Sequence, residues 1–133
     1  MQEIYYDLFK FFLAIVFGGL IGLERELKGK PAGFRTNILI CLGSTLYMIL
    51  SMKIAGDPGR IAAQVVTGIG FIGAGTIIQA RGTITGLTTA ATIFVVASIG
   101  LAIGSNQIIL ATIFTGLVLI VLTLLFCNYH QLK

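Results

Sequence analysis

The sequence alternates between long apolar segments and short breaks that carry charges, glycine or proline. No Asp, Glu, Lys or Arg occurs between Gly82 and Leu132. A charge-free run of that length is typical of segments that cross a lipid bilayer. We therefore expect an all-α fold, a polytopic integral membrane helical bundle with about five transmembrane helices in a single domain, residues 1–133. The expected spans are residues 4–23, 36–54, 58–80, 85–103 and 107–127.

The breaks between the apolar segments carry residues that end or begin helices. Pro31 and Gly33 interrupt the first loop, residues 24–35, which is the most charged part of the chain. Asp57 is a good N-cap for the third span, and Pro58 fits the first helical position, where no N–H is needed. Thr85 is the expected cap of the fourth span.

Composition excludes a soluble globular protein. The chain has 133 residues, of which 56% are hydrophobic and 11% charged, and its mean hydropathy is +0.99. A soluble domain carries about 25% charged residues. The net charge of +4 sits at the segment ends, so it predicts membrane topology and not nucleic-acid binding. The lipid bilayer is the expected partner.

The distribution of cations predicts how the chain is oriented in the membrane. Five spans place the two termini on opposite sides. One side would carry Arg25, Lys28, Lys30, Arg35, Arg81 and Lys133. The other side would carry Lys10, Lys53 and Arg60. Because cytoplasmic loops are enriched in Lys and Arg, we expect the first loop and the C-terminus in the cytoplasm and the N-terminus outside.

A polar stripe follows one face of the third span. Its members recur at spacings of three or four: Asp57, Arg60, Gln64, Gly68, Phe71 and Gly75. Asp57 and Arg60 can pair one turn apart, and Gln64 lies deeper and needs a hydrogen-bond partner. A helix cap with an ion pair and a functional polar site both fit this pattern.

Threonines line one face of the fourth span, at Thr85, Thr88, Thr89 and Thr92. Their hydroxyls can bond back to carbonyls of their own helix, which is the common arrangement. They can also form a polar lining with the third span, which a short turn joins to the fourth. We therefore take Asp57, Arg60, Gln64, Thr88 and Thr89 as the candidate intramembrane polar site.

The third span also contains Gly68, Gly70 and Gly73 in the spacing G-x-G-x-x-G. The dinucleotide-binding motif of that form needs a preceding strand and an acidic residue about 20 positions later, and here no Asp or Glu follows. Dense glycine in a membrane helix favours close helix packing over an unwound segment that exposes carbonyls. The expected packing glycines are Gly68, Gly70, Gly73, Gly75 and Gly86. Gly18 and Gly22 form a G-x-x-x-G with the same interpretation.

Charged residues flank the first loop and predict a cluster at the cytoplasmic interface. Glu24 and Arg25 end the first span, and Arg35 and Thr36 begin the second. A salt bridge that fixes the loop is the favoured interpretation, and a docking surface for a partner protein or an anion is the alternative. The only histidine, His130, has no second base nearby, so we expect no enzyme, and we expect no cofactor. No set of metal ligands is assigned.

Four segments together resemble the MgtC/SapB family of bacterial membrane proteins. They are residues 19–26 (GLIGLERE), residues 32–36 (AGFRT), Asp57 with residues 60–74 (RIAAQVVTGIGFIGA), and residues 86–91 (GLTTAA). The resemblance implies a polytopic protein of the inner membrane that is linked to magnesium limitation and, in some members, to virulence. Many members carry a cytoplasmic C-terminal domain, and this sequence ends at Lys133, so we expect the transmembrane domain alone.

Two functions fit these observations, and a purely structural role is a third interpretation. The first is a regulatory or stress-adaptation factor that acts on a membrane-protein partner, or on itself as a homo-oligomer, through the third and fourth spans. The second is a small oligomeric transporter or channel for an ion or solute, with the polar stripe as its path. The fifth span has only Thr112, Thr115 and Thr123 as polar residues after Gln107, so one subunit offers little polar lumen.

Overall fold

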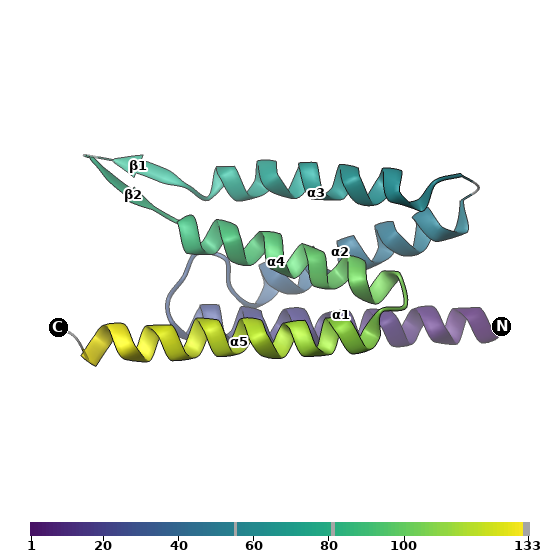
Figure 1. Cartoon of the computed structure of the whole chain (residues 1–133), viewed down its shortest axis with the longest axis horizontal. Helices are drawn as coiled ribbons and strands as arrows, with labels where there is room; N and C mark the ends of the chain where they lie inside the picture. Colours follow the sequence, from purple (N-terminus) through teal and green to yellow (C-terminus); the bar gives the residue numbers. More distant parts are fainter. Residues whose placement is uncertain (55, 81, 132–133) are drawn as a thin grey trace.

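The computed structural model describes residues 1–54, 56–80 and 82–131. In these residues five helices run up and down in turn, and the N-terminus and the last turn of α5 lie at opposite ends (Figure 1). The expected all-α fold is confirmed, with one short β-hairpin added. The elements are α1 (Gln2–Leu27), α2 (Phe34–Lys53), α3 (Pro58–Gly75), β1 (Ile78–Ala80), β2 (Thr83–Thr85), α4 (Leu87–Gly104) and α5 (Ile108–Gln131).

The two ends of the bundle differ in what they carry. One end, here called the N-terminal end, holds the start of α1, the α2–α3 turn and the α4–α5 turn (Figure 1). The other end, here called the loop end, holds residues 28–33, the β-hairpin and the end of α5 (Figure 1). Polar groups at one end are therefore separated from those at the other by the length of a helix.

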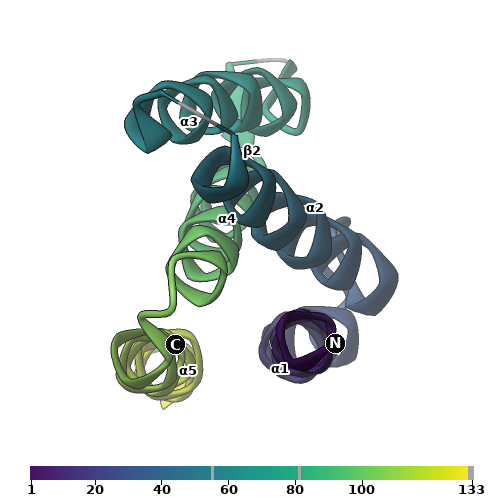
Figure 2. The same cartoon turned by 90° about the vertical axis from the view of Figure 1, so that its right-hand side faces the viewer.

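The helices form three layers. Figure 2 shows α2 and α4 in the middle, α3 on one side of them, and α1 and α5 on the other. Within the described residues, α1, α2 and α4 are long and apolar enough to cross a membrane, and residues 108–124 of α5 form a shorter apolar helix. The chain is an integral membrane protein.

Glycine pairs on two neighbours of α2, the helices α1 and α4, explain why the middle of the bundle is tight. A Cβ added at Gly18 of α1 would lie 2.8 Å from the Asn37 carbonyl oxygen. A Cβ added at Gly100 of α4 would lie 2.5 Å from the Cys41 carbonyl oxygen. Gly22 and Gly104, one turn further along each helix, make similarly close approaches to α2. Small residues of this kind let helix backbones approach in a membrane, where little hydrophobic force drives helices together.

The predicted packing of Gly18 and Gly22 is therefore confirmed, and the sequence contained a second G-x-x-x-G that was missed. Gly100 and Gly104 have the same spacing of four and press on α2 from α4, where Gly100 meets Cys41, the residue that Gly18 also meets. The buried core follows these contacts. Its fully buried side chains include Ile21 of α1, Cys41 of α2 and Val96 of α4.

Several predicted boundaries were wrong. The first span was expected to end near residue 23, but α1 continues to Leu27 and carries Glu24 and Arg25 within the helix. The third span was expected to reach residue 80, but α3 ends at Gly75 and β1 pairs with β2 instead. Thr85 does not cap α4, because it lies in β2 opposite Ile78.

Gly86 occupies the junction between the hairpin and α4. Its φ is +88°, in the left-handed region that favours glycine, and a Cβ added there would lie 2.1 Å from the Thr76 carbonyl oxygen. It was expected to pack two helices, and it serves a tight turn instead.

Candidate functional site

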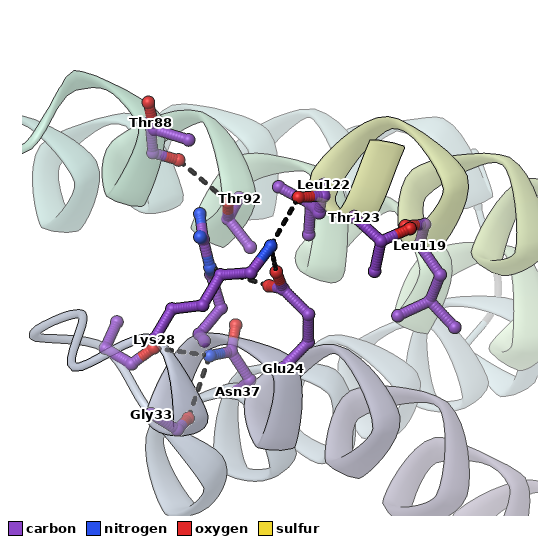
Figure 3. Close-up of polar contacts among 11 residues, drawn as sticks. Glu24, Lys28, Gly33, Asn37, Thr88, Thr92, Leu119, Leu122 and Thr123 are labelled. Atoms are coloured by element: carbon purple, nitrogen blue, oxygen red, sulfur yellow. Dashed lines mark hydrogen bonds and ion pairs between the residues drawn. The ribbon is translucent and has the colours of Figure 1, made fainter. Parts of the chain in front are cut away.

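The loop end holds a buried group of charges built on the last turns of α1. Glu24 forms an ion pair with Arg25, at 2.9 Å between Oε2 and Nε, and a second ion pair with Lys28. Lys28 Nζ also donates to the Leu122 carbonyl oxygen of α5 at 2.6 Å (Figure 3). The Glu24 to Lys28 spacing of four, with the acid on the N-terminal side, is the favourable order for an intrahelical pair. The hydrogen bond from Lys28 to Leu122 joins the end of α1 to α5.

Asn37 of α2 hydrogen-bonds to the loop that joins α1 to α2. Its side chain is fully buried, and Nδ2 donates to the carbonyl oxygens of Ala32, at 2.9 Å, and Gly33, at 2.8 Å. The Asn37 Oδ1 atom and the Arg25 Nη1 atom are buried, and neither has a hydrogen-bond partner among the described residues. Buried polar groups are normally hydrogen-bonded, so these two unpaired atoms lower the stability of the fold at this position.

The predicted interface cluster is therefore only partly assembled. Glu24 and Arg25 lie together, but Arg35 and Thr36 are exposed, and within the described residues Arg35 makes no ion pair. Lys28 takes the place expected of Arg35, because α1 extends one turn further than predicted. The Glu24 carboxylate is buried, and both of its ion-pair partners come from the end of α1.

A second group of charges, at the N-terminal end, was missed. Lys10 is only 7% exposed, and its Nζ lies 3.7 Å from Asp7 Oδ1 and donates to the Gly104 carbonyl oxygen at 3.4 Å. Lys53 at the end of α2 also pairs with Asp7. A cavity of about 300 Å³ borders these residues. The i, i+3 spacing of Asp7 and Lys10 was the available signal.

The polar stripe of α3 begins with a helix cap. Asp57 Oδ1 accepts a hydrogen bond from the Gly59 N–H at 2.8 Å, so Asp57 is the N-cap. Arg60 and Gln64 are exposed, and within the described residues neither side chain has a hydrogen-bond or ion-pair partner. Asp57 and Arg60 do not pair with each other. Both line a cavity of about 560 Å³ that also borders Gln64.

Thr88 and Thr89 do not belong to that cavity. They lie in the first turn of α4, at the loop end, whereas Asp57 precedes the first turn of α3 at the N-terminal end (Figure 1). The predicted single polar site is therefore wrong, because antiparallel neighbours place their N-termini at opposite ends. Thr89 is buried, and the Thr92 hydroxyl donates to the Thr88 carbonyl oxygen at 2.7 Å, as threonines in membrane helices often do.

The glycines of α3 lie on different sides of the helix. A Cβ added at Gly73 would lie 3.5 Å from the Ala90 carbonyl oxygen of α4, which is an ordinary packing contact. Gly68, Gly70 and Gly75 face open space. A helix turns about 100° per residue, so Gly68 and Gly70 lie on nearly opposite sides and cannot share one packing face. Among the described residues, Gly73 is the one glycine of this group whose added Cβ would contact another helix.

One side of α3 faces away from the rest of the bundle and carries small residues. Ala63, Thr67, Gly70 and Ala74 follow at spacings of four, three and four, and all four are exposed. The Thr67 hydroxyl donates to the Ala63 carbonyl oxygen at 3.1 Å, so it needs no other partner. We call this set the outer face of α3. Figure 2 shows α3 as an outer layer, on the side of the molecule away from α1 and α5.

Known proteins resemble the chain over most of its length. The MgtC family matches residues 11–129. The putative magnesium transporter YhiD of Escherichia coli K12 is 47% identical over 130 residues, which cover 90% of this chain and 59% of that protein. Protein MgtC of Brucella abortus is 41% identical over 114 residues, covering 84% of this chain and 48% of that protein. Protein MgtC of Salmonella typhimurium is 46% identical over 95 residues, covering 71% and 41%.

The chain thus spans about half the length of the curated relatives that it matches. No solved structure matches it.

Proposed function

The chain belongs to the MgtC family, and from this premise we propose that it is a regulatory factor of the bacterial inner membrane that supports adaptation to low magnesium. Where its bacterium is a pathogen, the same role would serve virulence. It acts by binding a helix of a membrane protein, either another protein or a second copy of itself, and not by conducting an ion. It is not an enzyme.

The outer face of α3 is the observation that carries this proposal. Ala63, Thr67, Gly70 and Ala74 form an exposed strip of small side chains that none of the described helices covers. Strips of small residues at this spacing are the surfaces on which membrane helices associate. Phe71, beside the strip, is 83% exposed and offers a large apolar contact to the same partner.

Transport is the second candidate, and two observations favour it. A 47% identical relative is named a putative magnesium transporter, and a cavity on α3 carries the Asp57 carboxylate. The packing of the bundle is less favourable to transport. The described Asp, Glu, Lys and Arg side chains lie toward the two ends, and fully buried apolar side chains such as Ile21 and Val96 fill the space between α1, α2 and α4.

The orientation in the membrane is part of the proposal. Four cations of the described residues lie at the loop end: Arg25, Lys28, Lys30 and Arg35. Lys10, Lys53 and Arg60 lie at the N-terminal end. Arg81 and Lys133, which also entered the prediction, lie outside the described residues. We place the loop end in the cytoplasm because positive charge favours that side.

Growth of a deletion strain under magnesium limitation tests the proposal. Gly70→Leu puts a bulky side chain on the outer face without a clash inside the chain, because nothing lies within 4 Å of a Cβ at that position. We expect normal amounts of Gly70→Leu protein in the membrane and loss of complementation. Gly116→Leu is the matched control, since Gly116 of α5 also faces open space. Full growth with Gly70→Leu would refute the proposed contact.

A photo-crosslinking residue at position 67 identifies what the outer face binds. A crosslinked band at twice the mass of the chain indicates a homo-oligomer, and another mass indicates a different membrane protein. The same residue at position 116 gives the background.

A further inference from the structure

A groove runs between α2 and α3, and of the outer face only Ala63 borders its polar end among the described residues. Its apolar part has a volume of about 560 Å³, a size typical of ligand sites. Leu39, Gly43 and Tyr47 of α2 form one wall, and Val65 and Ile72 of α3 form part of the other. Gly43 and Gly68 make the groove wide, because a Cβ at either position would meet nothing within 4 Å.

The groove becomes polar toward the N-terminal end. Gln64 and Ile61 line both the apolar cavity and the neighbouring cavity of Asp57 and Arg60, so the two are continuous. Ser51 of α2 lies at the same polar end, where its hydroxyl donates to the Pro58 carbonyl oxygen at 2.6 Å. The site thus has a charged mouth, an amide at the junction and an apolar floor.

The length of the apolar part of the groove indicates what kind of molecule would fill it. From Gln64 to Ile72 the helix rises about 12 Å. One leaflet of a bilayer contributes about 15 Å of hydrocarbon, half of the core thickness of about 30 Å. A transmembrane helix of a partner would need a groove about twice as long. One acyl chain of a lipid in the leaflet on the Asp57 side matches the length.

The charged side chains at the polar end of the groove indicate which lipid headgroup would bind there. Arg60 has no ion-pair partner among the described residues and can bind a phosphate oxygen. Asp57 has one carboxylate oxygen engaged with the Gly59 N–H and can accept from an ammonium group with the other. Gln64 lies about 6 Å deeper than Arg60, at the level where the ester groups of a lipid follow its phosphate.

We propose that this groove binds one phospholipid with a phosphate and a primary ammonium group in its headgroup, that is, a phosphatidylethanolamine. Arg60 binds the phosphate, Asp57 the ammonium group and Gln64 the ester region, and the acyl chain lies between Gly43 and Gly68. The Gln64 amide then has a partner, which a polar group in hydrocarbon requires.

Native mass spectrometry of the delipidated protein in detergent tests the site. Phosphatidylethanolamine, phosphatidylcholine and phosphatidylglycerol with identical acyl chains are titrated in turn. We expect one bound lipid, with phosphatidylethanolamine preferred. Arg60→Gln should weaken its binding at least about tenfold, since a hydrogen bond to a charged group is lost. Asp57→Asn keeps an N-cap residue but should bring the affinities for the ethanolamine and choline lipids close together.

Gly68→Leu fills the groove and should abolish lipid binding while the protein stays folded, as checked by circular dichroism. Gly116→Leu, on α5, should bind lipid like the unsubstituted chain. Equal binding of the three lipids, preference for phosphatidylglycerol, or unchanged binding by Gly68→Leu would each overturn the proposal. A dimer that Gly68→Leu dissociates, with no lipid bound, would assign the groove to a second copy instead.

Discussion

Gly100→Ala is predicted to destabilise the protein because Gly100 lies where α4 and α2 come closest. The new Cβ would lie 2.5 Å from the Cys41 carbonyl oxygen and 2.7 Å from Ser44 Cβ. Ordinary contacts begin near 3.4 Å, so the two helices must part locally by about 1 Å. The atoms in the way include backbone, which cannot rotate aside.

The magnitude follows from two losses and one gain. Overpacking of a tight contact costs about 1–3 kcal/mol. Separation also stretches the hydrogen bond from the Thr45 hydroxyl to the Gly100 carbonyl oxygen, now 3.1 Å, which is worth about 1 kcal/mol. Alanine returns up to about 1 kcal/mol through its higher helix propensity. We expect a net loss of about 1–3 kcal/mol in the free energy of unfolding.

Unfolding in mixed micelles, followed by circular dichroism because the chain has no tryptophan, measures this loss. Gly116→Ala is the control, since its Cβ meets open space and it should leave stability unchanged or raise it by up to about 1 kcal/mol. Equal stability of Gly100→Ala and the unsubstituted protein would refute the close packing of α4 on α2. An equal loss in Gly116→Ala would show that the effect is not specific to the contact.

Three further substitutions test other parts of the structure. Gly86→Ala should destabilise the hairpin–α4 junction, because φ is +88° and the Thr76 carbonyl group blocks a side chain; faster proteolysis between β1 and α4 would show it. Asn37→Leu should loosen the loop of residues 28–33 by about 2 kcal/mol, since two hydrogen bonds to backbone carbonyls are lost, and amide hydrogen exchange of the loop reports it; unchanged protection would contradict the role of Asn37. Gly29→Cys should react with a membrane-impermeant thiol reagent only after the cytoplasmic side is opened, and labelling from outside in intact cells would reverse the proposed orientation.

The helices could be predicted from the sequence because each is a long apolar run between strong breaks. The absence of charge from Gly82 to Leu132 left a bilayer as the natural environment, and the Asp57–Pro58 pair located the start of α3 correctly. Helix ends were harder to predict. Glu24 and Arg25 look like the start of a loop, but the Glu24–Lys28 pair and the contact of Lys28 with α5 carry α1 on to Leu27.

The direction in which each helix face points could not be derived from periodicity alone. Spacing showed that Gly68 and Gly75 share a side, yet it could not say whether a helix covers that side. It also could not show that Thr88 and Gln64 lie toward opposite ends, which follows from the antiparallel course of α3 and α4. The contact between Asp7 and Lys53 joins residues far apart in the chain, and no spacing of neighbouring residues in the sequence predicts it.

Magnesium flux into proteoliposomes that contain the purified chain tests the central claim most directly. A dye for Mg²⁺ inside the vesicles reports entry, and empty vesicles and Gly70→Leu vesicles run beside it. The proposed regulatory role predicts the same slow leak in all three, because apolar side chains fill the space between α1, α2 and α4. Saturable magnesium entry above the empty vesicles, lost in Asp57→Asn, would contradict the account and establish the protein as a transporter.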